Sequence, residues 1–250
     1  MGWNEDGGAV SGAFNEWSFV DQDIRAFLSL STRWATRLYD ETWKQAEGEF
    51  SAIFDPDRHT GDEHVGLFAS EVEGLWPNDY AWMLRAAVVR DAVTAFEVYL
   101  EKGLDEAFNR RGLAITRKEG RPSPPWRVLV KGHKVLGNDV DTGRIKQIRY
   151  LRHLLSHQRG ELRTEKMRVR FAQHHLLAAS LDPQLEDGEY LGSKVQLAEA
   201  TVEGVLDGLA AGVREADKRV WAIAWGGAPA PELDKIRARF AGPPDGHQDG

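Results

Sequence analysis

The sequence of 250 residues contains no cysteine. This absence excludes disulfide bonds, thiolate metal sites such as zinc fingers, and cysteine nucleophiles. No stretch approaches 18 consecutive apolar residues, so we expect no helix that spans a membrane. Residues 1–6, MGWNED, lack the basic start and the apolar stretch of a secretory signal peptide, so we expect a cytoplasmic protein.

Motifs that mark several large enzyme classes are also missing. The sequence has no GxxxxGKS/T or GxGxxG pattern for phosphate binding and no GxSxG pattern for a serine nucleophile. His153 and His157 are four residues apart, but no HExxH pattern is present. A catalytic zinc usually takes a third protein ligand, and Arg152 beside His153 would repel a cation. We therefore expect no bound metal and no cofactor.

The charges of the chain are very unevenly distributed along the sequence. The net charge of the chain is −7, and its hydrophobic content of 42% is ordinary for a globular protein with one core. Residues 109–170, however, contain 17 Lys and Arg against 5 Asp and Glu, a local charge of +12. Such a segment can form a face that binds a polyanion. The alternative is a solvated region whose charges scatter in space.

Within this basic segment, residues 147–162 (QIRYLRHLLSHQRGEL) predict an amphipathic helix. Apolar residues recur at helical spacing and fall on one arc, and polar residues fall on the other. Gly160 provides a stop. The apolar arc consists of Ile148, Leu151, Leu154 and Leu155, and the polar arc of Arg149, Arg152, His153, Ser156 and His157.

The polar arc carries residue types that suit phosphodiester cleavage. An imidazole titrates near neutrality, so His157 can take or give a proton. Arg152 stays charged and offers forked donors that match a phosphate. Together they suit RNA, whose 2′-hydroxyl is a built-in nucleophile. The alternative is a solvated basic helix face.

The string Arg152-His153-Leu-Leu-Ser-His157, in a Leu-rich helix and followed by Arg159-Gly160, resembles the R-x4-H signature of HEPN domains. The second position of that signature is most often Asn and is His153 here. The resemblance spans about residues 79–225, and its specific part is residues 152–157. It implies an all-α homodimer that cleaves RNA without metal. It also suggests a toxin or phage-defence effector with an antitoxin or another regulatory partner.

The resemblance also implies roles for individual residues. His157 would be the general base or acid, Arg152 would stabilise the pentacoordinate phosphate, and His153 would assist by hydrogen bonding. HEPN domains often place an acidic residue of an earlier helix near the catalytic arginine, which indicates Glu97 here. Ser156 would then support the catalytic residues, and RNA would be bound by Arg149, Arg159 and Arg163.

The rest of the chain predicts an all-α fold, an antiparallel helical bundle with an N-terminal helical extension. The extension covers residues 1–77 and opens with a loose lead-in. The HEPN-like domain covers residues 78–226, and residues 227–250 form a tail rich in Pro and Gly. One long helix or two consecutive helices are expected at 21–54, and single helices at 63–75, 79–109, 124–136, 194–225 and 232–240.

Smaller details are predicted from local signals. Asn78 is a candidate N-cap for the helix at 79–109, and Asp139 or Asp141 for the motif helix. Residues 167–171 fit a strand and a helix about equally well.

Two other functions stay open. A HEPN-like domain can bind RNA, a nucleotide or a protein without cleaving anything. A purely structural helical module can also use its basic face to bind a protein.

Overall fold

The computed structural model describes residues 2–3, 8–50, 77–115, 123–172 and 195–229. These residues confirm the predicted all-α fold, since two very short antiparallel strands are the only sheet among them. None of the described helices is long and apolar enough to cross a membrane. The elements are β1 (Gly2–Trp3), β2 (Ala9–Val10), α1 (Gly12–Phe50), α3 (Pro77–Asn109), α4 (Trp126–Val135), α5 (Gly143–His157), α6 (Glu165–Ala172) and α8 (Glu199–Ala224).

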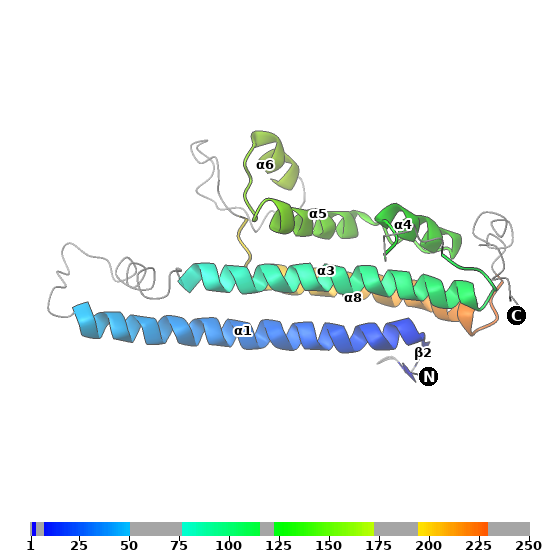
Figure 1. Ribbon diagram of the computed structural model, residues 1–250, viewed down its shortest axis with the longest axis horizontal. Helices are drawn as coiled ribbons and strands as arrows, with labels where there is room; N and C mark the ends of the chain where they lie inside the picture. Colours follow the sequence, from blue (N-terminus) through cyan, green and yellow to red (C-terminus); the bar gives the residue numbers. More distant parts are fainter. Residues whose placement is uncertain (1, 4–7, 51–76, 116–122, 173–194, 230–250) are drawn as a thin grey trace, which may run out of the picture.

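The helices form three layers (Figure 1). Helices α3 and α8 run side by side in the same direction and make up the middle layer. Helix α1 packs on one side of them and runs the opposite way. On the other side α4 and α5 follow one another, also opposite to α3, and α6 lies on the outer side of α5. The predicted all-α helical bundle is therefore confirmed, with α3 and α8 as a parallel pair between helices that run the opposite way.

The core forms where the apolar arcs of the helices face one another. In α3, Val89, Phe96 and Leu100 recur at helical spacing and are fully buried. Val213 of α8 and Leu151 of α5 join them in one cluster. Burying these side chains is the main force that holds the layers together.

The N-terminus of α1 is fastened to the bundle by a buried polar cluster. The Ser11 Oγ accepts a hydrogen bond from Phe14 N (3.0 Å), and it donates one to Asp217 of α8. The Tyr99 hydroxyl also donates to Asp217, at 3.3 Å. Burial raises the pKa of Asp217 and that of Tyr99. Glu106 accepts from the first two backbone N–H groups of α1, at 3.1 and 3.0 Å.

This cluster corrects the predicted start of the first helix. The sequence predicts a loose lead-in at residues 1–14 and a helix that begins near Asp21. Helix α1 instead begins at Gly12, because Ser11 satisfies a first-turn N–H group and is itself buried.

Other predicted helix ends also differ from the structure. Asn78 lies inside α3, which begins at Pro77, and Thr142 rather than Asp139 or Asp141 caps α5 by accepting from Ile145 N at 3.3 Å. Residues 167–171 belong to helix α6. Helix α8 begins at Glu199, five residues after the predicted start.

The helices expected at 79–109 and 124–136 are confirmed, apart from one or two residues at their ends. Those expected at 63–75 and 232–240 lie outside the described residues. The division of the chain at 77/78 and 226/227 stays a prediction. Across the first of these boundaries, Phe14, Trp17 and Leu28 of α1 share the core of the other helices.

Candidate functional site

Helix α5 separates its two arcs as the sequence predicts. All four residues of the apolar arc are buried, with Leu151 at 0% exposure. On the polar arc, His153, Ser156 and His157 are exposed, whereas Arg149 and Arg152 are half-buried. The motif therefore stands on a rigid helix whose back is anchored in the core.

The two motif histidines lie together at the C-terminal end of α5. One helical turn separates His153 from His157, and their ring centroids are 4.8 Å apart with an interplanar angle of 46°. Helix α5 ends at His157 itself. Gly160 follows at a φ of 76° and donates its N–H to Leu154 O at 3.0 Å, which closes the helix end as expected. Both imidazoles are thus presented to solvent at a fixed terminus.

A polar hollow of about 720 Å³ lies next to these histidines, and we call it the α5–α6 hollow. Helices α3, α5 and α6 all contribute to its wall. Among the described residues, four permanent cations line it and only one carboxylate, Glu97. His153 lines it too, whereas His157 does not. The cations are Lys146, Arg149, Arg152 and Arg170.

Arg152, which lines this hollow, also has an unsatisfied donor. Its Nε is buried and has no hydrogen-bond partner. A buried donor without a partner costs about 1–3 kcal/mol, and more when the group is charged. Because Arg152 also lines the hollow, its guanidinium is a candidate contact for a phosphate there.

Glu97 lines the same hollow as Arg152, but its partner is Arg149. The Arg149 Nε lies 3.0 Å from Glu97 Oε1, and both side chains are 28% exposed. The guanidinium also lies over the ring of Trp126, 3.8 Å from its centroid. Arg149 is therefore held by residues of α3 and α4. The role of Trp126 was not predicted, because the contact joins three different helices.

Two further cations of the hollow were not singled out from the sequence. Arg170 of α6 places its guanidinium 4.3 Å from the ring centroid of Tyr150. The Lys146 Nζ lies 3.5 Å from Asp141 Oδ2, so its charge is only partly balanced. Both residues belong to the basic segment at 109–170, and that local charge was the one signal that could have indicated them.

The other two predicted RNA-binding residues lie outside the hollow. Arg159 follows the end of α5, with an unusual φ of 51°, and is exposed. The Arg163 Nε lies 2.8 Å from Glu161 Oε2. The structure thus brings Arg149, Arg152, His153 and Glu97 together and leaves Arg159 and Arg163 beyond the helix end.

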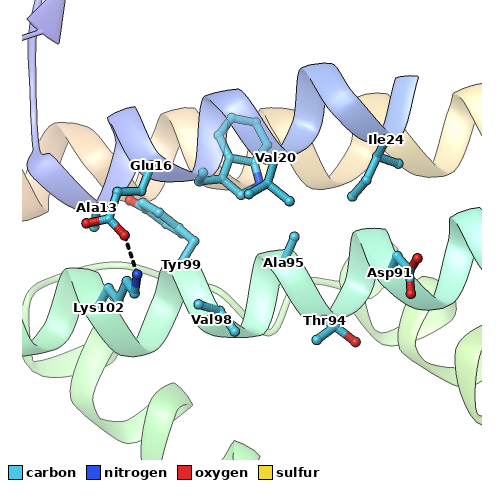
Figure 2. A pocket seen from close by; sticks show the side chains of 11 residues that line it. Ala13, Glu16, Val20, Ile24, Asp91, Thr94, Ala95, Val98, Tyr99 and Lys102 are labelled. Atoms are coloured by element: carbon cyan, nitrogen blue, oxygen red, sulfur yellow. Dashed lines mark hydrogen bonds and ion pairs between the residues drawn. The ribbon is translucent and has the colours of Figure 1, made fainter. Parts of the chain in front are cut away.

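A second hollow of about 410 Å³ lies between α1 and α3 (Figure 2). Its wall is largely apolar and includes Val20, Ile24 and Val98. Glu16 and Lys102 at one end form an ion pair with each other. None of the described residues that line this hollow is a histidine. It therefore offers much less chemistry than the α5–α6 hollow.

Metal-ligating side chains do not gather in the described ranges, where no group of three His, Asp or Glu is placed to hold an ion. His174 and His175 lie outside those ranges. Comparisons with models of protein families, with curated proteins and with solved structures find no match to this chain. We therefore infer the function from the residues around α5.

Proposed function

We propose that this protein is a metal-independent endoribonuclease of the HEPN type. One observation carries the proposal: α5 presents the paired imidazoles of His153 and His157 beside a cationic hollow that Arg152 lines. The imidazoles supply proton transfer and the guanidinium supplies charge stabilisation, the two needs of RNA transesterification.

The reaction needs no group beyond RNA and protein side chains. The 2′-oxygen attacks the neighbouring phosphorus as its proton passes to an imidazole, so the O2′–P bond forms. The P–O5′ bond then breaks, and the leaving oxygen takes a proton from an imidazolium. The products are a 2′,3′-cyclic phosphate and a 5′-hydroxyl. Arg152 stabilises the extra negative charge on the pentacoordinate phosphate.

His157 is the proton-transfer group in this proposal, and His153 orients it or the phosphate by hydrogen bonding. Their separation of 4.8 Å between ring centroids allows one imidazole to influence the other. Ser156 is exposed on the same arc and can support the substrate with its hydroxyl. Glu97 acts through Arg149, whose Nε it holds.

A second copy of the chain completes the site. Within one chain, Arg152 lines the hollow whereas His157 does not, so the two residues do not share one wall. A two-fold dimer in which two α5 helices face each other brings both His157 side chains into one cleft. This arrangement supplies one imidazole as base and another as acid.

The second candidate function is RNA or nucleotide binding without cleavage. The observation that favours it is that Arg152 lines the hollow whereas His157 does not, because the hollow can then hold a phosphate without any contribution from His157. An antitoxin or trigger that controls the protein fits both functions. The role as a toxin or defence effector follows from the HEPN resemblance only.

The test is incubation of the purified protein with tRNA and mRNA in EDTA, followed by mapping of the cut ends. We expect cleavage with 2′,3′-cyclic phosphate and 5′-hydroxyl ends. A substrate with a single 2′-deoxy nucleotide at the cut site should resist. Binding without any cut would favour the second function, and strict dependence on magnesium or manganese would overturn the proposed chemistry.

A further inference from the structure

We infer that the α5–α6 hollow is a binding subsite for a backbone phosphate of RNA, next to the phosphate that is cleaved. Lys146, Arg149 and Arg170 hold this neighbouring phosphate, and Arg152 remains available for the scissile one. The inference rests on the proposed function for the identity of its ligand. The site itself follows from charge, geometry and size.

The charge of the hollow is strongly unbalanced. Four permanent cations face one carboxylate, and that carboxylate already accepts from Arg149. Lys146 has a further acidic neighbour in Asp141, at 3.5 Å, whereas Arg170 lies against an aromatic ring. Like charges in one concavity repel each other, and the walls focus their field. A phosphate in the hollow lowers this repulsion and satisfies several N–H donors at once.

Two of the cations are held in place before any ligand binds. Glu97 fixes the Nε of Arg149, and the Trp126 ring supports its guanidinium from one face. Tyr150 supports the guanidinium of Arg170 in the same way. None of these contacts uses the terminal N–H groups of Arg149 or Arg170. Those groups form the planar fork that matches phosphate oxygens. Holding them beforehand reduces the entropy cost of binding.

The size of the hollow suits one nucleotide unit better than a bare ion. Its volume of about 720 Å³ falls within the range of roughly 300–1,000 Å³ found for small-ligand sites. A free phosphate and an RNA backbone share the same chemistry. RNA is the favoured source, because His153 and Arg152 line the same hollow and belong to the proposed cleavage motif.

The experiment uses the full-length double variant Lys146→Ala/Arg170→Ala. Its matched control is Lys131→Ala/Lys134→Ala, which removes two exposed lysines of α4 that do not line the hollow. The probe is a single-stranded oligonucleotide with 2′-deoxy sugars throughout, so that cleavage cannot interfere. Fluorescence anisotropy at several salt concentrations gives the affinity and its salt dependence.

We expect the double variant to bind at least about tenfold more weakly than the wild type, since it cannot form the same charge-assisted hydrogen bonds. The slope of log K against log salt should become shallower by about 0.7 for each phosphate that the variant no longer binds. The control should change affinity by less than about threefold. Arg170→Gln, which keeps much of the side chain, should fall between them and guards against a folding defect in the double variant.

Unchanged affinity and slope in the double variant would overturn the inference. It would also be overturned if inorganic phosphate protects the wild type but not the double variant from thermal unfolding while oligonucleotide binding is equal in both. The outcome is separable from that of the proposed function. If the wild type cleaves no RNA but the double variant binds more weakly, the subsite is supported and the nuclease activity is rejected. If the wild type cleaves RNA but the double variant binds as well as the wild type, the nuclease activity is supported and the subsite is rejected.

Discussion

His133 is buried inside the bundle and stabilises it as a neutral ring. Its exposure is 0%, and its Nε2 lies 3.0 Å from the backbone oxygen of Leu100. The Asn138 Nδ2 lies 3.4 Å from its Nδ1. Nε2 therefore carries the proton and Nδ1 accepts. Burial lowers the pKa of His133 from 6.5 to about 4.

This shift predicts a loss of stability in mild acid. The unfolded chain binds a proton at His133 near pH 6.5, whereas the folded chain resists it down to about pH 4. The contribution is fully present above pH 6.5 and is lost as the pH falls toward 4, at about 1.4 kcal/mol for each pKa unit, so about 3 kcal/mol in total. Urea unfolding at pH 7 and pH 4.5 measures most of it.

The control for this prediction is His133→Gln, which keeps a side-chain N–H near Leu100 O but does not titrate. We expect this variant to be less stable at neutral pH and to lose less stability between pH 6.5 and 4.5. An equal loss in both proteins would show that the other groups of the chain cause it.

At the scale of elements, the attachment of α1 depends on a contact that is distant in sequence. Ser11 caps the helix and donates to Asp217, 206 residues away. The predicted N-terminal extension therefore packs on the bundle from its first turn. Without this hydroxyl, one N–H group of α1 and the buried Asp217 carboxylate would each lose a partner.

We expect Ser11→Ala to lower the free energy of unfolding by about 1–3 kcal/mol, the usual range for removal of a cap and of a buried hydrogen bond. Ser29→Ala, the same replacement at an exposed position of α1, should change it by less than about 0.5 kcal/mol. Chemical denaturation of both variants gives the comparison. Equal effects would mean that the Ser11 cluster does not hold α1.

A helix could be predicted from the sequence where its buried apolar residues recur at regular helical spacing. The long helix at 79–109 and the arcs of α5 follow a period of 3.6 residues, which the sequence displays directly. Phe27 and Trp34 helped to predict the first helix, yet they are 44% and 64% exposed. The start of α1 was missed because its cap depends on Asp217, and no local pattern reveals such a partner.

Some residues of the candidate site were likewise predictable from the sequence and others were not. Arg152, His153 and His157 were predicted because they share one helix and one short motif. Trp126 of α4, which supports Arg149, and Arg170 of α6, which lines the hollow, were missed because ring contacts with α5 join them to the site. The spacing of residues within one segment cannot predict how separate helices pack.

At the scale of the whole molecule, charge is separated between the layers. Residues 123–172, which carry α4, α5 and α6, contain 12 Lys and Arg against 4 Asp and Glu. Helix α1, on the opposite side of α3 and α8 (Figure 1), contains 4 against 7. Residues 123–170, the larger described part of the basic segment, thus lie on one side of the bundle. An RNA strand would be steered toward the side that carries the motif.

The proposed dimer must bring two of these basic sides together. Five of the nine large exposed apolar side chains among the described residues lie on α1, where Phe27, Leu30 and Trp34 follow helical spacing. A dimer through α5 should therefore tighten as salt screens the repulsion, whereas one through α1 should be much less affected. Sedimentation of micromolar protein at low and high salt distinguishes the two.

The absence of cysteine makes a direct test of this interface possible. In the proposed dimer the two His157 positions share one cleft, so His157→Cys should form a disulfide between chains under oxidising conditions. Trp34→Cys, at an exposed position on α1, is the matched control and should stay monomeric on a non-reducing gel. Cross-linking through position 34 and not through 157 would contradict the proposed site.

The central claim is that His157 performs chemistry, and single-turnover cleavage of bound RNA by His157→Ala tests it most directly. General acid–base catalysis is worth about 10²–10⁴ in rate, so we expect a loss of that size. Affinity for RNA should barely change, because His157 does not line the cationic hollow. Arg152→Ala should lower both cleavage and affinity, and its salt dependence should become shallower by about one phosphate contact.

Arg159→Ala and Arg163→Ala serve as matched controls outside the hollow. They should at most weaken binding and leave the cleavage rate of bound RNA intact. Circular dichroism should show all four variants folded, since none of these side chains belongs to the apolar arc of α5. We predict that only the two motif variants lose cleavage of bound RNA. Wild-type cleavage by His157→Ala would contradict the proposed role of this histidine.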